Sequence, residues 1–316
     1  MNQPLPLQSA KPPSSTGKVT VVGSINVDQT VRVQRLPSPG ETLLGSSITI
    51  GPGGKGANQA LAAARLGATV SLIGAVGDDA SAAAATELLQ SAGVDLSAVT
   101  SVAGPTGLAL IYLADDAENT IVVVPGANAA MDASMVETSA ARIAEAAVVV
   151  LQGEIPADGI ATAVRLSTGR MVLNLAPVVA LDHSLIRAAN PLVVNEHEAA
   201  LVLSQLDAEA AVPAEDEALV VALRAQGVPG VVLTRGAQGA ICSDQAGTFS
   251  VPAPRVNAID SSGAGDAFVG ALSARLAMGE TLLEASHYAA RVGAFAVQSH
   301  GTQASYPHSG DALPEA

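Results

Sequence analysis

Short apolar runs rich in Val, Ile and Leu alternate with longer runs rich in Ala and Leu along most of this chain. Ala57–Leu66 and Ser81–Ala92 are typical of helices that pack against a sheet. Because each apolar run is short and continuous, it predicts a strand buried on both faces. The alternation therefore predicts a three-layer α/β/α fold around a wound, mostly parallel sheet. The predicted strands are Val19–Ile25, Thr69–Ala75, Val148–Gln152, Met171–Leu175 and Val231–Thr234.

Two segments interrupt this rhythm and carry strand-like patterns without helices. Residues 29–50 contain prolines and a glycine followed by an alternating run, and residues 104–126 read as a hairpin around an acidic turn. We expect both to leave the sheet at its edge and to form a small β-sheet lid. The predicted organisation is a flexible tail at 1–17, one α/β domain at 18–308 and a loose C-terminal tail at 309–316.

Composition excludes several classes of partner. The formal net charge of -14 argues against nucleic acid and against an acidic membrane surface. With Cys242 as its single cysteine, the chain can form neither an internal disulfide nor a cysteine zinc cluster, which predicts a reducing cytoplasm. No run approaches the ~18 apolar residues of a membrane helix. The first seventeen residues lack the apolar core of a signal peptide.

The strongest chemical signal is the run Asp260–Phe268, which reads Asp-Ser-Ser-Gly-Ala-Gly-Asp-Ala-Phe and precedes a helical pattern. A glycine-rich turn that opens a helix directs free N–H groups and the positive end of the helix dipole at one point. We interpret Gly263, Ala264 and Gly265 as an anion hole for a phosphoryl group. Asp266 would lie beside it, where a carboxylate can take a proton from an attacking hydroxyl.

A second glycine-rich run, Gly51–Asn58, allows two interpretations. Gly51, Gly53 and Gly56 match the spacing of a dinucleotide-binding loop, and Asp78 lies near the position of a ribose-binding acid. However, the preceding strand belongs to the inserted segment, and Asp78 lies beyond the end of its strand. A Walker phosphate loop is excluded because Lys55 is followed by glycine.

Lys55 is the one lysine after position 18, since every other basic residue there is arginine. A compact ammonium in a tight glycine turn is therefore interpreted as a functional requirement. Asn26 and Asp28 follow the first predicted strand and point to the same side of an extended chain. An amide and a carboxylate placed in this way can bind the vicinal hydroxyls of a sugar.

Taken together, these motifs resemble the ribokinase branch of the PfkB carbohydrate kinase family, over about 18–307. Glycine-rich signatures correspond to Gly53–Asn58 and Asp260–Phe268. The motifs between them occur in the order Thr106–Gly107, Pro125–Asn128, Glu154, Asn174–Pro177, Asn195–Glu198 and Thr234–Gly239. The resemblance implies a ribokinase-like α/β domain with a β-lid and a homodimer formed through that lid.

The resemblance also implies roles for individual residues. Sugar binding is assigned to Asn26, Asp28, Gly54, Lys55, Asn58, Glu154 and Asp266. The catalytic base is Asp266, with Gly263, Ala264 and Gly265 as the anion hole. ATP binding is assigned to Asn195, Thr234, Gly236, Gly239 and Gly265, and Mg²⁺ is organised indirectly by Asn195 and Glu198. An activating K⁺ is assigned to Asp260, Ser262, Ala296, Ser299, Gly301 and Ser305. Ala290 is small where many relatives carry a side chain near adenine, which leaves nucleotide preference open.

The predicted activity is ATP-dependent phosphorylation of the primary hydroxyl of a sugar, with D-ribose giving D-ribose 5-phosphate. Alternatives within the family are a kinase for deoxyribose, another sugar or a nucleoside. Two alternatives from other classes stay open, a nicotinamide-dependent oxidoreductase using the Gly51–Gly56 loop and a sugar-binding protein without catalysis. The intact Gly-Ala-Gly-Asp run weighs against the last, because a binder needs no anion hole beside an acid.

Overall fold

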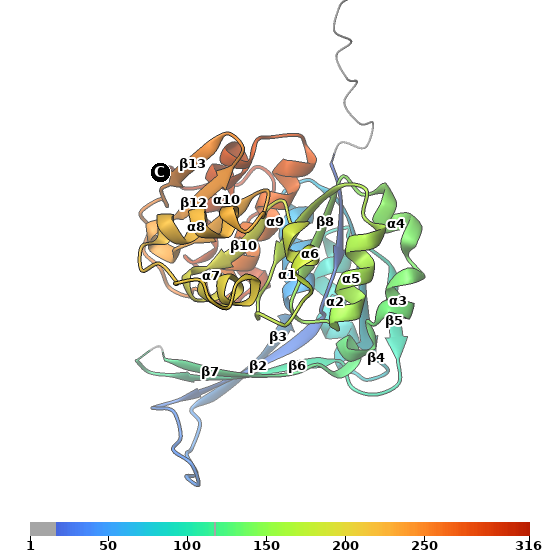
Figure 1. Ribbon diagram of the computed structural model, residues 1–316. Coiled ribbons are helices and arrows are strands. Elements are labelled where there is room, and N and C mark those ends of the chain that lie inside the picture. Colours follow the sequence, from blue (N-terminus) through green and yellow to red (C-terminus); the bar gives the residue numbers. More distant parts are fainter. Residues whose placement is uncertain (1–16, 117) are drawn as a thin grey trace, which may run out of the picture.

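Two sheets organise the protein in the computed structural model, which describes residues 17–116 and 118–316 (Figure 1). The larger sheet has nine strands in the order β13-β12-β11-β10-β9-β8-β1-β4-β5. Its strands run parallel except for β12, which pairs antiparallel with β11 on one side and with the edge strand β13 on the other. Its strands are β1 (Lys18–Val22), β4 (Thr69–Gly77), β5 (Asp95–Val102), β8 (Val148–Gln152), β9 (Arg170–Asn174), β10 (Leu192–Asn195), β11 (Val231–Thr234), β12 (Ala240–Asp244) and β13 (Gly247–Val251).

Helices cover both faces of this sheet, which confirms the three-layer fold predicted from the alternating runs. Along β8, Val148 and Val150 point into one hydrophobic core, while Val149 and Leu151 point into the other. The first core is covered by α1 (Lys55–Arg65), α2 (Ser81–Ser91), α9 (Ala264–Ala277) and α10 (Leu282–Ala296). The second is covered by α3 (Ala133–Glu137), α4 (Ala140–Glu145), α5 (Ala157–Leu166), α6 (His183–Arg187), α7 (Glu196–Leu206) and α8 (Asp216–Ala225).

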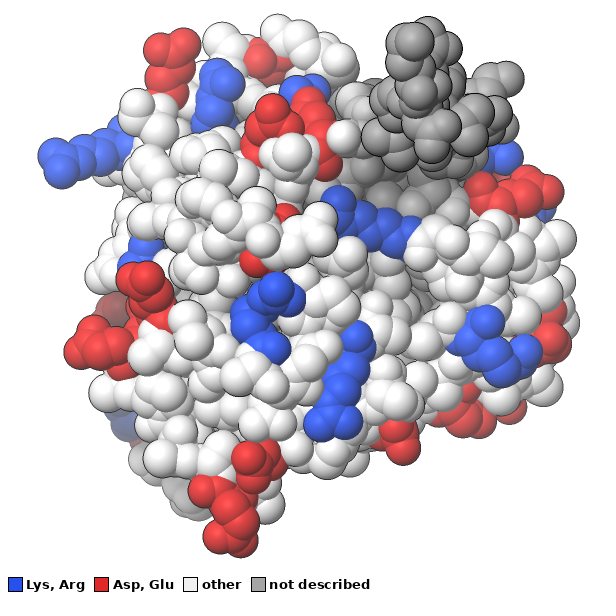
Figure 2. Space-filling view, turned by 45° about the horizontal axis from the view of Figure 1, so that its top comes forward, with Lys and Arg blue, Asp and Glu red and all other residues white. Residues whose placement is uncertain are grey.

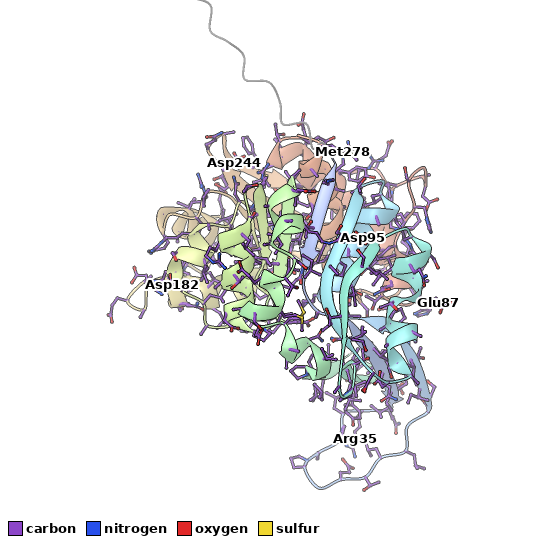
Figure 3. The ribbon with its side chains drawn as sticks, turned by 90° about the vertical axis from the view of Figure 1, so that its right-hand side faces the viewer. Arg35, Glu87, Asp95, Asp182, Asp244 and Met278 are labelled. Carbon is purple, nitrogen blue, oxygen red and sulfur yellow. The ribbon has the colours of Figure 1, made fainter. Side chains whose placement is uncertain are left out.

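The inserted segments form the smaller sheet, which projects from the body in Figures 1 and 3. Its order is β3-β2-β6-β7. The hairpin predicted at 104–126 is confirmed, since β6 and β7 pair antiparallel. Arg35 lies on the loop between β2 and β3, at the far end of the projection (Figure 3), and forms an ion pair with Glu41. The strands are β2 (Asn26–Val33), β3 (Ser47–Gly53), β6 (Gly107–Ala114) and β7 (Asn119–Val124).

The expectation that both insertions leave the large sheet at its edge is wrong for one of them. The hairpin at 104–126 does follow β5, an edge strand. The segment at 29–50 instead follows β1, which lies between β8 and β4 in the interior of the sheet. The chain can leave there because the carboxyl end of any strand opens onto the loops of that side, whatever its position in the sheet.

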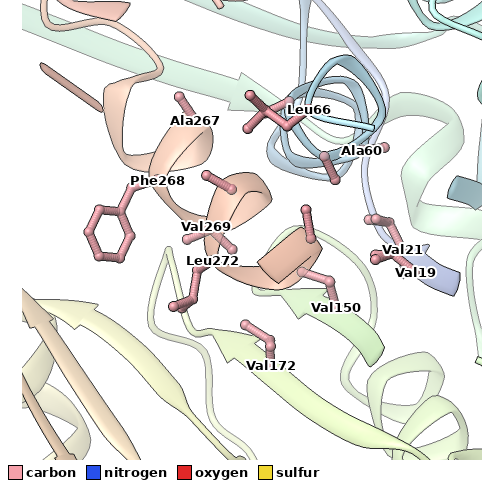
Figure 4. Close-up of a cluster of buried hydrophobic side chains, with 14 of the residues drawn as sticks. Val19, Val21, Ala60, Leu66, Val150, Val172, Ala267, Phe268, Val269 and Leu272 are labelled. Atoms are coloured by element: carbon pink, nitrogen blue, oxygen red, sulfur yellow. The ribbon is translucent and has the colours of Figure 1, made fainter. Parts of the chain in front are cut away.

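Helices α1 and α9 pack closely against each other and fix the start of α9 on the sheet. In Figure 4, Val269 and Leu272 of α9 share one buried cluster with Ala60 of α1 and with Val150 and Val172 of the sheet. The two helices approach at Gly270, where an added Cβ would lie 2.6 Å from the Ala62 Cβ atom. This contact fixes the relative position of the first turns of α1 and α9, which carry Lys55 and Asp266.

The remaining surface features concern the ends of the chain and its charges. Of the predicted tail at 1–17, residues 1–16 lie outside the described residues. Residues 309–316, expected to be loose, form no helix or strand, but Arg291 donates hydrogen bonds to the carbonyl oxygens of Leu313 and Pro314. Acidic and basic side chains are interspersed on the face shown in Figure 2. Among the described residues, none of the helices is long and apolar enough to span a bilayer.

Candidate active site

Asp266 lies in the first turn of α9 and is 6% exposed. Its two carboxylate oxygens accept hydrogen bonds from consecutive residues of α1. Nδ2 of Asn58 donates to Oδ2 over 2.9 Å, and Nε2 of Gln59 donates to Oδ1 over 2.8 Å. One donor at each oxygen fixes the plane of the carboxylate, which leaves its remaining lone pairs as the acceptor that a bound hydroxyl would meet.

The turn before α9 has the geometry of an anion site. Gly263, the residue that caps the helix, has φ 71°, a left-handed conformation that favours glycine. The Ala264 N–H donates to the Ser261 carbonyl oxygen over 3.2 Å. Within the described residues the amides of Gly265 and Asp266 have no such partner, as expected in a first helical turn. Together with the Gly263 amide, which has no partner among the described residues either, they are the donors that the site offers to an anion, whereas the predicted donor Ala264 is already engaged.

Tyr306 holds this turn from the opposite side. Its buried hydroxyl donates to the Gly263 carbonyl oxygen over 3.0 Å, and burial raises its pKa well above the usual value, so the phenol keeps its proton. A Cβ added to Gly263 would lie 2.2 Å from the Thr302 Cγ2 atom. Glycine is therefore required here both for its φ angle and for this close approach.

Lys55 lies among acidic side chains at the start of α1. The Asp266 carboxylate, and after it those of Glu154, Glu198 and Asp28, raises the pKa of Lys55 against the opposing effect of burial. Oε2 of Glu154 accepts from the Lys55 backbone N–H over 3.0 Å and from the Ser24 hydroxyl over 2.5 Å. The lysine thus remains charged and balances several carboxylates at one point.

Asp28 lies on β2 beside the same cluster. Burial, together with the negative charges of Glu154 and Asp266, raises its pKa to about 7, although Lys55 opposes the shift. The side chain lies over Gly53 of the neighbouring strand, where an added Cβ would be 2.0 Å from Oδ1 of Asp28. The absence of a side chain at Gly53 is what makes room for this carboxyl group.

The sequence predicts that Asn26 and Asp28 directly follow a first strand at Val19–Ile25, and this is wrong in detail. The strand ends at Val22, and both residues belong to β2 of the lid sheet. Their two-residue spacing still directs them to one side. Asn26 is buried at the start of β2, and its Oδ1 accepts from Nδ2 of Asn128 over 2.7 Å. Asn128 also accepts from the Ile25 N–H, so it ties the start of the lid to the body.

Asn195 and Glu198 join β10 to α7 through a reciprocal pair of hydrogen bonds. The Asn195 side chain accepts from the Glu198 N–H over 2.8 Å, and the Glu198 carboxylate accepts from the Asn195 N–H over 2.9 Å. This capping box fixes both side chains at the mouth of the pocket. Burial raises the pKa of Glu198, and the hydrogen bond from Asn195 opposes that shift.

One pocket brings together Lys55 of the first glycine-rich run with Gly263, Gly265 and Asp266 of the second. The other predicted sugar-binding and anion-hole residues do not line it, namely Asn26, Asp28, Gly54, Asn58, Glu154 and Ala264. It is lined by Lys55, Asn174, Ala176, Val193, Asn195, Glu198, Thr234, Gly263, Gly265, Asp266 and Val269. Gly236 and Gly239 belong to the turn after β11 and do not line it. Ala290 is buried in the core on α10 and does not line it either.

The two segments that carry the residues assigned to K⁺, 260–262 and 296–305, lie against each other. Oδ2 of Asp260 accepts from the Gly301 N–H over 3.0 Å, and the Asp260 N–H donates to the Val297 carbonyl oxygen over 3.2 Å. Burial alone would raise the pKa of Asp260, but hydrogen bonds from the Gly301 and Ser262 amides hold it below its usual value. Across residues 17–116 and 118–316, no cluster of three His, Cys, Asp or Glu side chains forms a metal site.

The oxidoreductase interpretation of the Gly51–Gly56 loop loses its structural basis. A dinucleotide loop must follow a strand of the main parallel sheet. Here Gly51 and Gly53 are themselves residues of β3, which pairs with β2 in the small lid sheet, and Gly56 already lies in α1. Asp78 accepts a hydrogen bond from the Gly104 N–H over 2.9 Å, so it holds the start of the hairpin segment.

Three buried glutamines of the site are absent from the predicted site residues. Gln59, Gln152 and Gln303 are 0–2% exposed and lie in the hydrogen-bonded group around Asp266, which also contains Asn174 of the predicted motif Asn174–Pro177. The available signal was a polar residue within a run of small apolar residues, as for Gln59 between Ala57 and Leu61. A buried amide in such a run has to find partners, and therefore indicates a polar network.

Comparison with known proteins agrees with this geometry. Residues 16–309 match the family described as pfkB family carbohydrate kinase. This chain belongs to the PfkB carbohydrate kinase family. Among curated members it is 36% identical to a ribokinase of Schizosaccharomyces pombe over 92% of this chain and 94% of that protein. It is 32% identical to a deoxyribokinase of Salmonella typhimurium, over 92% of this chain and 95% of that protein.

The fold of this PfkB member is also that of solved relatives. It is similar to the structure of Arabidopsis thaliana ribokinase complexed with ribose and ATP, with a TM-score of 0.83 and 30% identity. The match covers 93% of this chain and 96% of that one. The ribokinase-like fold predicted from the sequence is therefore confirmed, including the separate lid sheet.

Proposed function

We propose that this chain transfers the γ-phosphoryl group of ATP to the primary hydroxyl of D-ribose. The observation that carries the proposal is the position of Asp266, a buried carboxylate in the same pocket as the free amides of the α9 turn. Its curated relatives include ribokinases at 33–36% identity, and one solved relative holds ribose and ATP. The deoxyribokinase at 32% identity makes 2-deoxyribose the second candidate acceptor.

In this mechanism Asp266 accepts the proton of the sugar hydroxyl as its oxygen attacks the γ-phosphorus. The new O–P bond forms while the bond from the γ-phosphorus to the bridging oxygen breaks, and ADP leaves with that electron pair. The Gly265 and Asp266 amides and the α9 dipole face the negative charge that spreads over the phosphoryl oxygens. Asn26, Asp28, Gly54, Lys55, Asn58 and Glu154 would hold the sugar, and Thr234, Gly236 and Gly239 the nucleotide.

The proposal includes two cations. Asn195 and Glu198, fixed by their capping box, would organise Mg²⁺, which neutralises phosphate charge when bound. The K⁺ site would use Asp260, Ser262, Ala296, Ser299, Gly301 and Ser305. The fit of the K⁺ residues rests on the contact between their two loops, which the Asp260–Gly301 hydrogen bond joins. An oxygen-rich environment of this kind suits a hard monovalent cation.

We also propose that two copies associate through the lid. On one side of the lid sheet, the register aligns Ile50 with Gln29, Leu110 and Val122. In the next row on the same side, it aligns Ile48 with Val31 and Tyr112. Ile48, Ile50 and Val122 are 50–59% exposed. Asn26 and Asp28 point to the opposite side by the strand alternation.

The expected compartment is the reducing cytoplasm. The buried Cys242 thiol, with a pKa of about 11, is unreactive there.

The test is ADP release from Mg·ATP with ribose, 2-deoxyribose, hexoses and nucleosides, each measured with and without K⁺. We expect ribose to give the highest kcat/KM and K⁺ to stimulate it. A preference for another acceptor would retain the kinase chemistry and refute the choice of ribose. If no acceptor supports ADP release in either buffer, the proposed activity is refuted.

A further inference from the structure

A chain of buried side-chain amides leads from the wall of the pocket to Asp266. Nδ2 of Asn174 donates to the Val193 carbonyl oxygen over 3.0 Å. Oδ1 of Asn174 accepts from Nε2 of Gln59 over 2.9 Å, and the same Nε2 donates to Asp266 over 2.8 Å. Oε1 of Gln59 in turn accepts from Nε2 of Gln152 over 2.7 Å. Both N–H groups of Gln59 are therefore used, one of them on Asp266.

The orientation of these amides is set by the backbone. A carbonyl oxygen can only accept, so Val193 requires the nitrogen of Asn174 and leaves the oxygen of Asn174 facing Gln59. That oxygen requires the nitrogen of Gln59. If the Gln59 amide reversed, its oxygen would face two acceptors, Oδ1 of Asn174 and the Asp266 carboxylate. The strand β10 thus dictates that an N–H group points at Asp266.

The second amide arm to Asp266 has no such anchor. Nε2 of Gln303 donates to Oδ1 of Asn58 over 2.8 Å, and Asn58 donates to Asp266. Among the described residues, Oε1 of Gln303 has no hydrogen-bond partner. The ionised Asp266 requires the nitrogen of Asn58, but once Asp266 carries a proton or is replaced by an amide, the amides of Asn58 and Gln303 can reverse together. Only the Gln59 arm keeps a fixed polarity through turnover.

We infer that Gln59 is the positioning residue of the catalytic base, held in one amide orientation by Asn174 and the Val193 carbonyl. It fixes the carboxylate plane of Asp266 while the proton arrives and departs. The inference rests on the proposed function of Asp266 as the base. It adds a residue that does not contact the sugar and acts through Asp266 alone.

The experiment is a double-mutant cycle between Gln59→Met and Asp266→Asn, read out as kcat, sugar KM and sugar affinity by calorimetry. Methionine retains the length of glutamine and removes its donor. We expect Gln59→Met to lower kcat about 10- to 100-fold, as a small misplacement of a catalytic group does. Sugar KM and affinity should stay within about twofold. In the Asp266→Asn background, Gln59→Met should cause no further loss.

Two further variants separate positioning from general damage. Gln205→Met removes another glutamine amide, which binds the Leu181 carbonyl oxygen from the far end of α7, and should leave kcat unchanged. Gln59→Met/Gln152→Met removes both partners of the Gln152–Gln59 hydrogen bond, so it serves if the single variant fails to fold. It should show the same loss of kcat.

The outcomes distinguish this inference from the proposed function. Wild-type protein without kinase activity would refute the proposed function. Active wild type with an unchanged kcat in Gln59→Met would overturn the inference and leave the function intact. Equal losses in the wild-type and Asp266→Asn backgrounds would also overturn it, because Gln59 would then act through the fold and not through Asp266.

Discussion

At the scale of single residues, the two amide arms determine how the site tolerates the loss of its base. Asp266→Asn should lower kcat about 10²- to 10⁴-fold, the usual contribution of a positioned general base. The new amide can place its oxygen toward Gln59 and its nitrogen toward Asn58, because the amides of Asn58 and Gln303 can reverse together. We therefore expect an almost unchanged melting temperature and sugar affinity.

Steady-state kinetics, calorimetric sugar titration and thermal unfolding test this expectation together. Wild-type turnover in Asp266→Asn would show that another group accepts the proton. A large fall in melting temperature would instead show that the Asn58–Gln303 arm cannot reverse, although the assignment of the base would survive.

Asp28 predicts a pH dependence of sugar binding. Its pKa is about 7 in the free site because of burial and the charges of Glu154 and Asp266. Sugar hydroxyls donate to its ionised form, so the dissociation constant should rise about tenfold between pH 8 and pH 6, as the group takes up its proton. The effect on folding has the opposite sign, because an acid whose pKa is raised on folding contributes stability at low pH that is lost as the pH rises through 7.

Calorimetric titration of ribose across this range is the measurement, with Asp28→Asn as the control that carries no titrating group. The variant should show a dissociation constant that hardly changes with pH. A flat profile in the wild type would mean that Asp28 stays ionised in the free site or does not contact the sugar.

The residues that could be predicted were those whose chemistry shows in local sequence. Asp266 and Lys55 follow glycine-rich turns, and the free amides and helix start that such turns create are local properties. Gln59 could not be assigned in this way. It lies among Ala57, Ala60 and Leu61 in an apolar helix, and its partners come from β8, β9 and α9. Only the fold brings these partners together.

At the scale of elements, the contact between α1 and α9 sets the position of Asp266 relative to Asn58 and Gln59. Gly270 allows that contact, since a Cβ there would lie 2.6 Å from both the Gln59 carbonyl oxygen and the Ala62 Cβ atom. Gly270→Ala should lower the free energy of unfolding by about 1–3 kcal/mol, the usual effect of overpacking. It should also lower kcat, because the base moves away from its donors.

Gly293→Ala on α10 is the matched control, to be compared by chemical denaturation. A Cβ at Gly293 would lie 3.6 Å from the Ala264 carbonyl oxygen, an ordinary contact. This variant should be more stable by about 0.5–1 kcal/mol, because alanine favours the helix. Similar effects of the two substitutions would show that helix propensity, and not the α1–α9 approach, governs Gly270.

The bounds of β8 and β11 were predicted without error, because a buried parallel strand is a continuous apolar run with clear ends. The sequence pattern did not reveal that β1 ends at Val22 and that the chain enters β2 of the lid sheet at Asn26. The chain stays extended on both sides of Gly23, and local pattern does not tell which sheet a strand joins. That choice depends on β6, β3 and Asn128, which are distant in sequence.

At the scale of the whole molecule, the lid is exposed on the side away from the site. Ile48, Ile50 and Val122 are each at least half exposed, and the strand register places them on the same side of the sheet as Leu110 and Tyr112. An apolar band of this kind on a sheet that projects into solvent is typical of an association surface. A second copy of the lid presents the same band and can bury it symmetrically.

This arrangement predicts the effect of one charge on the assembly. Ile50→Lys would place an ammonium group in the middle of the apolar band that the proposed dimer buries. It has no acidic partner across the register there, so the dimer should dissociate. Sedimentation velocity should then give a dimer for the wild type and a monomer for the variant. Val221→Lys on α8, where the valine is 52% exposed, adds the same charge at a distant position, and this variant should remain dimeric.

Two outcomes would show that the lid is not the interface. One is a monomeric wild type, and the other is a dimer that persists in Ile50→Lys.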